Sequence, residues 1–456
     1  MTKQLTGIVE RIQHHWINPE SYHQQIAVSF LWVSLFVFIG KIAGAAKEMV
    51  IAWRYGVSST VDAYVFLFNI INWPVSIWFS VMSVVLIPTF VRLRREDNAG
   101  LHEFRSELYG LVFLLGFGLA IGMGFFFSQT SLLLTIGGMS TARWQVTVGM
   151  IWPLALCVPL AMTTYLLATE TMARRRHGNT LLEGIPSAVL GLLILVTAPW
   201  DWHILAIGTL MGFFAQCVAM FWYLQRFDSL PRPRLLSLKS PVWSTLKFAI
   251  ATMLVAQILQ ALTTLVDTFW AARLGEGTLA AMGYANRVLA LILGLGATAI
   301  SRAMLPILSL TADHEHTLRY RMTKQWSLLL FGLGLATASV VWLTAPWIIR
   351  LLFERGSFSA TDTILVADLL RWASLQLPFY FAGLVWVALI VSRRKYYLLI
   401  FVGVGNLIVK IGVNILAVPV FMAQGLYLGT ACLYCFAMFA CWYAAMNIRP
   451  NSERYL

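Results

Sequence analysis

The stretch WSLLLFGLGLATASVVWLTAPWII, residues 326–349, decides the fold class, because it runs from end to end without a charged side chain. An α-helix of about 20 residues crosses the roughly 30 Å hydrocarbon core of a bilayer. Lipid offers no partner for backbone N–H and C=O groups, so a segment of this kind must be helical. A transmembrane β-strand would instead show about ten residues of alternating hydrophobicity. The stretch therefore predicts a membrane-spanning helix.

The same pattern recurs along the whole chain. Hydrophobic residues make up 59% and charged residues 12% of the 456 residues, against roughly 45–50% and 25% in soluble domains. We therefore expect an all-α polytopic membrane protein with about twelve transmembrane helices. The expected apolar blocks are 26–52, 62–90, 107–128, 146–170, 181–200, 203–225, 244–271, 279–309, 326–352, 363–391, 397–420 and 424–446.

Basic residues divide the connections between these blocks into two classes. Most of the Lys and Arg outside the blocks lie in every second connection, including 174–176 and 393–395. The positive-inside rule places these connections and both termini in the cytoplasm. Topology then accounts for the net charge of +13 without a nucleic-acid partner. We expect a multi-pass protein of the bacterial inner membrane.

The second half of the sequence matches the first half at one constant offset. The matching pairs are Glu48 and Asp267, Ala52 and Ala271, Arg54 and Arg273, Gly56 and Gly275, Pro159 and Pro378, and Arg174-Arg175-Arg176 with Arg393-Arg394-Lys395. This offset predicts a duplicated six-helix unit, residues 1–228 and 229–456, in which both halves have the same orientation. Parallel repeats of this kind place the substrate site of a transporter between the halves. The matching prolines, Pro159 and Pro378, are expected to be hinges.

Charged residues inside the blocks are the candidates for function, since each costs about 2.5–3.5 kcal/mol at the bilayer centre. They must face a wet cavity or an opposite charge. We expect Lys41, Lys47 and Arg287 to line a cavity for an anionic cargo, because the planar guanidinium suits phosphate. The charges expected to balance or couple this cavity are Glu48, Asp267 and Lys410.

Ion pairing that locks helices together is the alternative role for such charges. Asp368 and Arg371 stand three residues apart and are expected to neutralise each other. Under the same alternative, Arg287 pairs with Asp267 instead of binding cargo.

No motif in the sequence indicates catalysis or a cofactor. There is no nucleophile elbow, no Walker A lysine and no metal-spaced set of histidines. All five cysteines lie inside apolar blocks, including the CxxC of Cys432 and Cys435, and are expected to be buried thiols. We therefore expect a protein that is not an enzyme and that uses no metal and no cofactor.

Three stretches carry a family resemblance. They are residues 40–48 (GKIAGAAKE) with Arg54-Tyr55-Gly56 and Asp62-Ala63-Tyr64; Leu265-Val266-Asp267 with residues 274–277 (LGEG), 284–287 (YANR) and Leu305-Pro306; and residues 352–358 (LFERGSF) with Asp362-Thr363 and Leu377-Pro378. Together they resemble the lipid II flippase family (MurJ/MviN) of the multidrug/oligosaccharidyl-lipid/polysaccharide exporter superfamily.

The resemblance implies a V-shaped pair of six-helix bundles. It also implies alternating access that carries a polyprenyl-diphosphate-linked sugar from the cytoplasmic to the outer leaflet. Lys41, Lys47, Asp62 and Arg287 match charged positions of the family motifs, and Asn69 stands where the family usually has a lysine. These five residues are the expected substrate-binding set.

The cargo itself stays open between two classes of lipid-linked glycan. The chain is expected to end after about twelve helices, whereas typical lipid II flippases add a final helix pair. Both a lipid II-type peptidoglycan precursor and an exopolysaccharide or O-antigen repeat unit are therefore expected cargoes. The other partners expected are membrane lipid and glycan-synthesis enzymes.

Two other functions compete with the flippase. A multidrug or cation antiporter of the same superfamily needs an acidic, aromatic cavity, and the buried surplus of Lys and Arg argues against one. A membrane glycan polymerase or ligase needs catalytic residues in a sizeable outer loop. The longest candidate loop, near residues 129–145, is short.

Overall fold

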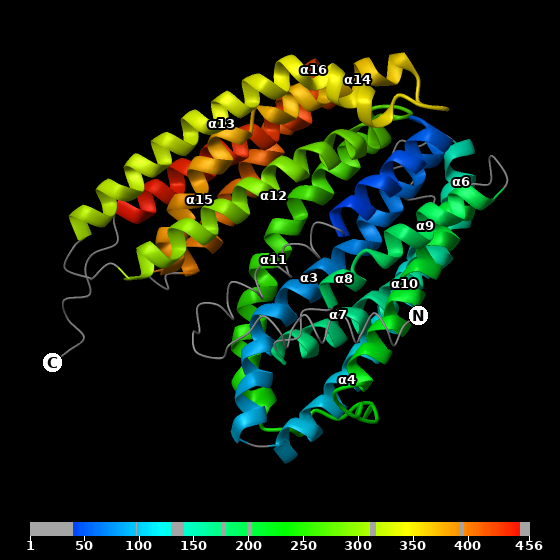
Figure 1. Ribbon diagram of the computed structural model, residues 1–456, viewed down its shortest axis with the longest axis vertical. Helices are drawn as coiled ribbons and strands as arrows, with labels where there is room; N and C mark the ends of the chain where they lie inside the picture. The colour runs from blue at the N-terminus through cyan, green and yellow to red at the C-terminus, as the bar shows by residue number, and fades with distance from the viewer. Residues whose placement is uncertain are drawn as a thin grey trace, which may run out of the picture.

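The computed structural model describes residues 40–96, 98–128, 141–174, 179–197, 203–310, 316–392 and 396–446. In these ranges the regular secondary structure is helical throughout (Figure 1), which confirms the predicted all-α class. Within the same ranges, nine helices are long and apolar enough to cross a membrane, and Thr278–Gly294 is a shorter apolar helix. The exact number of twelve spans stays a prediction, and the chain termini lie outside the described residues.

The helices follow the expected apolar blocks closely. Residues 40–55 are helical, and α16 is interrupted at Met422, where φ is 52° and ψ is −130°. This interruption falls between the two last expected blocks. The labelled helices are α3 (Ser59–Glu96), α4 (Asn98–Ser128), α6 (Thr141–Ala155), α7 (Cys157–Ala173), α8 (Asn179–Leu182), α9 (Ile185–Val196), α10 (His203–Gln225), α11 (Val242–Arg273), α12 (Thr278–Leu310), α13 (His316–Phe353), α14 (Ala360–Ser374), α15 (Leu377–Ser392) and α16 (Tyr396–Met446).

Helix contacts fall into two groups joined by a few helices. In the first half of the chain, α3, α4 and α10 pack on α6 and α7, and α9 packs on α10. In the second half, α12 to α16 pack on one another (Figure 1). Helix α11 lies against both α16 and α3, and α12 also contacts α3. The division into units 1–228 and 229–456 stays a prediction.

Helix boundaries recur at the offset of the sequence match. The offset that pairs Glu48 with Asp267 also pairs Ser59, where α3 begins, with Thr278, where α12 begins, and α6 and α14 correspond at both ends. Pro159 and Pro378 lie in the first turns of α7 and α15, where a missing N–H breaks no helical hydrogen bond. Each follows a short interruption, after α6 and after α14. Their role as hinges stays a prediction.

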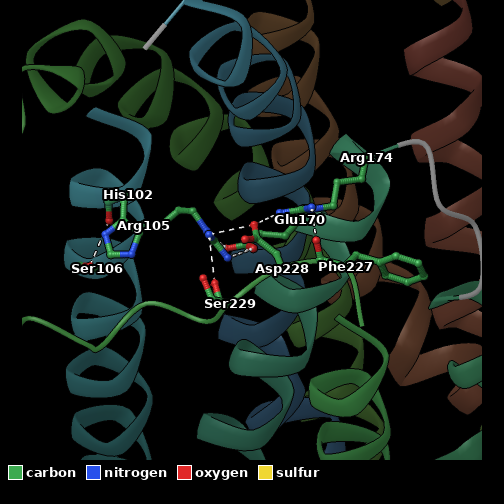
Figure 2. Close-up of polar contacts among 8 residues, drawn as sticks. All are labelled: His102, Arg105, Ser106, Glu170, Arg174, Phe227, Asp228 and Ser229. Carbon is green, nitrogen blue, oxygen red and sulfur yellow. Dashed lines mark hydrogen bonds and ion pairs between the residues drawn. The ribbon is translucent and has the colours of Figure 1, made fainter. Parts of the chain in front are cut away.

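The connection between α10 and α11 is fixed to α4 and α7 at its first residues (Figure 2). Arg105 of α4 donates to both oxygens of Glu170 of α7, at 3.0 and 2.7 Å, and to Asp228 at 3.0 Å. Arg174 forms a second ion pair with Asp228. Arg105 and Glu170 are both buried, and their pairing makes that burial possible.

The rest of this connection is held by a second buried carboxylate, Glu107 of α4. It accepts hydrogen bonds from Ser237 Oγ at 2.8 Å and from the backbone N–H groups of Lys239 and Ser240 at 2.8 and 3.1 Å. It also accepts one from Trp243 Nε1 at 2.8 Å, at the start of α11. The midpoint connection, which joins the halves, is therefore a bound strap and not a loose linker.

Candidate functional site

The structure gathers four of the predicted charged residues between the helix of residues 40–55 and α12. Glu48 Oε1 lies 2.9 Å from Lys47 Nζ and also contacts Arg287 Nη2. Lys41 approaches α12 as well, since a Cβ added at Gly294 would be 2.9 Å from Lys41 Nζ. Gly294 follows Arg287 by two helical turns, on the same face. We call Lys41, Lys47, Glu48 and Arg287 the cation cluster.

The cation cluster has more positive than negative charge. Lys47 and Arg287 share the Glu48 carboxylate, and Lys41 is a third cation beside α12, so the four side chains carry a net charge of +2. The exposed fraction is 12% for the Lys47 side chain and 15% for Glu48, but 43% for Arg287. Unbalanced charge in an apolar setting is costly unless a counter-charge or water reaches it. Lys41 and Arg287 are the exposed cations of this cluster, and the Arg287 guanidinium suits a phosphate group.

A cavity of about 830 Å³ lies mainly in the second half of the chain. Its walls come from α3, α11, α12, α15 and α16, and Asn69, Asp267 and Lys410 are among its lining residues. Ligand pockets in proteins span roughly 300–1,000 Å³. The cavity is therefore large enough for a bound organic group.

The charged pair in the cavity wall is fully balanced. Lys410 Nζ lies 2.9 Å from Asp267 Oδ2 and donates to Leu426 O at 2.8 Å and to Thr430 Oγ1 at 2.5 Å. Asn414 Nδ2 donates to the other carboxylate oxygen at 3.2 Å. Lys410 is 1% exposed. A buried ion pair with this many partners holds helices α11 and α16 together and carries no net charge.

Helix α12 contributes residues to both the cation cluster and the cavity. Asn286 lines the cavity, whereas Arg287, the next residue, contacts Glu48. Successive residues of an α-helix point about 100° apart, so the two sites lie on adjacent faces of one helix. One ligand can therefore contact both sites by spanning the adjacent faces of α12 that carry Asn286 and Arg287.

Asp62 has a different environment from the other predicted binding residues. Its Oδ2 accepts from Gly277 N at 2.5 Å and its Oδ1 from Ala280 N at 2.7 Å, and the residue is 1% exposed. These amides belong to the start of α12, so Asp62 supplies the N-terminal cap of that helix from α3. Both carboxylate oxygens are used inside the fold, and contact of Asp62 with cargo stays a prediction.

The three motifs that carried the family resemblance meet near this cap. Tyr284 Oη donates to Gly56 O at 3.0 Å, and Ser357 N donates to Trp53 O at 2.8 Å. A Cβ at Gly56 would overlap the backbone oxygen of Ser357, so only glycine allows this approach of the two loops. The motifs therefore form one contact between the two halves of the chain.

The structure contains neither of the two ion pairs considered from the sequence, Arg287 with Asp267 and Asp368 with Arg371, among its described contacts. Arg287 pairs with Glu48 and Asp267 pairs with Lys410, so the alternative in which Arg287 pairs with Asp267 is wrong. Asp368 accepts a hydrogen bond from Gln424 at 2.9 Å. Arg371 donates to Trp342 O at 3.0 Å, so Asp368 and Arg371 have separate partners. Spacing along one helix could not reveal these contacts, because the partners come from distant helices.

The uncharged polar lining of the cavity was missed in the sequence. Gln257, Gln260 and Thr264 of α11 recur at helical spacing, and all three line the cavity. That spacing was the available signal. This signal is weak, because amides and hydroxyls lower the hydropathy of a block much less than charges do. Among the described residues, no group of His, Cys, Asp and Glu is arranged to hold a metal ion.

Long apolar helices, a balanced cavity and an adjacent cation cluster define a membrane transport protein. A family model described as lipid II flippase MurJ matches residues 51–449. The chain therefore belongs to the MurJ lipid II flippase family, a family of bacterial inner-membrane transporters.

Individual relatives and folds agree with this assignment. The chain is 23% identical over 367 residues to a probable lipid II flippase MurJ of Buchnera aphidicola subsp. Baizongia pistaciae, covering 78% of this chain and 71% of the relative. A solved lipid II flippase MurJ in an inward closed conformation has a TM-score of 0.79 at 16% identity, covering 91% of this chain and 87% of that one. An inward-facing MATE-family multidrug transporter has a TM-score of 0.75 at 13% identity, covering 89% and 94%. At these identities the two structures establish a shared fold.

Proposed function

We propose that the protein carries a polyprenyl-diphosphate-linked glycan from the cytoplasmic to the outer leaflet of the inner membrane. The observation that carries this proposal is the net positive cation cluster with an accessible Arg287. A diphosphate supplies the missing negative charge, and guanidinium binds phosphate through two parallel hydrogen bonds. The polyprenyl tail stays in the bilayer. Enzymes that build the glycan on the cytoplasmic side are the partners that must supply this cargo.

Alternating access is the mechanism that these contacts support. The positive-inside rule assigns the end that carries Ser58, Gly275 and Ser357 to the outer side. The contacts of Asp62 with α12 and of Ser357 with Trp53 would then close the outer end. The two halves would open there by movement about Pro159 and Pro378, while the strap at Glu107 keeps their cytoplasmic ends joined.

A cation antiporter is the second candidate, because the MATE fold is shared. Charge argues against it. The cavity carboxylate Asp267 is already neutralised by Lys410, and the cation cluster repels a lipophilic cation. A flippase for an anionic lipid needs a surplus of positive charge instead, and the cation cluster has such a surplus.

The test is flipping in proteoliposomes of a fluorescent polyprenyl-diphosphate-linked glycan, followed with a membrane-impermeant quencher. We expect transfer between leaflets with the protein and none in its absence. A bis-maleimide crosslink between Trp53→Cys and Ser357→Cys should stop transfer, and each single cysteine variant treated with the same reagent is the control. No transfer by the unmodified protein contradicts the flippase. Full transfer after crosslinking contradicts opening at this end.

A further inference from the structure

We infer that the cavity between α11, α12, α15 and α16 is a glycan subsite that takes an uncharged sugar of the cargo next to its diphosphate. This inference rests on the proposed function and deepens it, since it names the chemical class of the group that enters the cavity. Under this inference, Asn286 and Gln260 determine which sugar the protein accepts next to the diphosphate.

The lining chemistry matches a neutral, hydroxyl-rich ligand. Among the described lining residues, the charged ones are Asp267 and Lys410, which neutralise each other at 2.9 Å. The other polar lining groups are amides, hydroxyls and phenols, of which Gln257, Gln260 and Asn286 are examples. Amides both donate and accept hydrogen bonds, as sugar hydroxyls do. An anionic site would show unpaired Lys or Arg instead.

Several of these amides have hydrogen-bonding capacity left for a ligand. Asn406 Oδ1 is buried and has no hydrogen-bond partner in the described part of the chain, which is costly unless a ligand or water satisfies it. Tyr427 Oη donates to Asn286 Oδ1 at 3.0 Å. That contact orients the Asn286 amide and leaves its N–H groups as donors. Asn286 and Gln260 are both exposed to the cavity.

One cavity wall supplies aromatic surface. Tyr380 and Tyr434 both line the cavity, with ring centroids 5.1 Å apart and an interplanar angle of 82°. Pockets that hold an organic ligand combine such apolar surface with a few polar groups that fix its orientation. The amides of α11 and α12 supply those polar groups here.

The order of groups along α12 matches the covalent order of the cargo. In a polyprenyl-diphosphate glycan, the first sugar is bonded directly to the diphosphate. Arg287 presents its guanidinium to the cation cluster and Asn286 presents its amide to the cavity. The two residues are neighbours on adjacent faces of one helix. A diphosphate at Arg287 therefore delivers its first sugar to Asn286, and any charged peptide that the glycan carries has to extend outside this cavity.

The neutral lining also predicts what is rejected. A sugar acid in this cavity would bring a carboxylate beside Asp267, while the Lys410 ammonium already has three oxygen partners. A buried charge without a partner is strongly unfavourable. We therefore expect discrimination against a uronic acid at the first position.

The experiment measures binding to the full-length protein in nanodiscs. The three probes are polyprenyl diphosphate alone, the same lipid carrying one N-acetylhexosamine, and the same lipid carrying one hexuronic acid. We expect the neutral sugar to bind about tenfold more tightly than the bare diphosphate, and the uronic acid to bind no better than the bare diphosphate.

The variants Asn286→Leu and Gln260→Leu should each remove most of the gain from the neutral sugar and leave binding of the bare diphosphate unchanged. Gln225→Leu, at the exposed end of α10, is the matched control and should keep the gain. A neutral sugar that adds no affinity, variants that keep the gain, or a uronic acid that binds as tightly as the neutral sugar would each overturn the glycan subsite. Failure of all three lipids to bind would overturn the proposed function itself.

Discussion

The cation cluster and the Asp267–Lys410 pair both place charge among apolar helices, but they balance that charge differently. The Lys410 ammonium is 1% exposed and has three oxygen partners, one of them a carboxylate. In the cation cluster, Lys47 and Arg287 share Glu48, Lys41 adds a further positive charge, and the Arg287 side chain is 43% exposed. A balanced, enclosed pair stabilises the packing of helices. An unbalanced, accessible cluster is available to an anion that arrives from outside.

The largest expected effect is at Arg287. Replacing it by alanine removes a charge-assisted contact to diphosphate, so we expect the initial flipping rate in proteoliposomes to fall about 100-fold. Arg287→Lys keeps the charge but loses the planar fork, and should retain about a tenth of the rate. Arg350→Ala is the control, because among its described contacts this exposed arginine pairs only with Glu354, one helical turn further along. Equal flipping rates for Arg287→Ala and Arg350→Ala would contradict a functional difference between the cation cluster and the Asp267–Lys410 pair.

The second prediction concerns stability at the balanced pair. Lys410→Ala leaves the largely buried Asp267 carboxylate without its cation, and should destabilise the protein by about 3–5 kcal/mol. The double variant Lys410→Met with Asp267→Asn removes both charges and should recover most of that loss. Unfolding midpoints in detergent measure the difference. If the double variant is as unstable as Lys410→Ala, the loss of stability does not come from leaving the Asp267 charge unpaired.

A smaller effect is expected at Asp62, whose carboxylate is satisfied within the fold as Lys410 is. Asp62→Ala removes the cap of α12 and should cost about 1–2 kcal/mol. The loss falls on the contact between the halves, so labelling of Ser357→Cys by an external maleimide should increase roughly five- to thirtyfold. Affinity for polyprenyl diphosphate should stay unchanged. A large drop in that affinity would place Asp62 with the cation cluster instead.

The smallest effect is expected for Lys47→Arg, which preserves the charge next to Glu48. Flipping should stay within about twofold of the natural protein, because Arg also reaches the carboxylate and keeps the net charge of the cluster. Lys47→Glu reverses the charge and brings the cluster to neutrality, and its flipping should fall at least tenfold. Tolerance of Lys47→Glu would show that the surplus charge is not used.

The sequence alone predicted the features of this structure that depend on residues close together in the chain. Apolar runs such as 326–349 must be helical in lipid, and α13 covers that run. The candidate charges were also found, because a Lys or Arg inside an apolar block has few explanations. Their pairing was not predictable in this way. Glu48 pairs with Arg287 and Asp267 with Lys410, each across two helices far apart in the chain, and helical spacing carries no information across such a separation.

The strap at Glu107 shows the same limit. In the sequence, Glu107 is one charge at the edge of an apolar block. In the structure it is buried and holds residues 237–243 by four hydrogen bonds. Only the packing of α4 against that connection reveals a fixed element.

Flipping by the double variant Arg287→Ala with Glu48→Gln tests most directly whether the cation cluster binds cargo. This pair of changes removes the ion pair as a unit and restores the net charge of +2, but the guanidinium is absent. If Arg287 binds diphosphate, the double variant should flip a polyprenyl-diphosphate-linked glycan at no more than about a tenth of the natural rate. If Arg287 only neutralises Glu48, removing both should return flipping to the natural rate. That recovery would contradict the role of Arg287 in binding cargo.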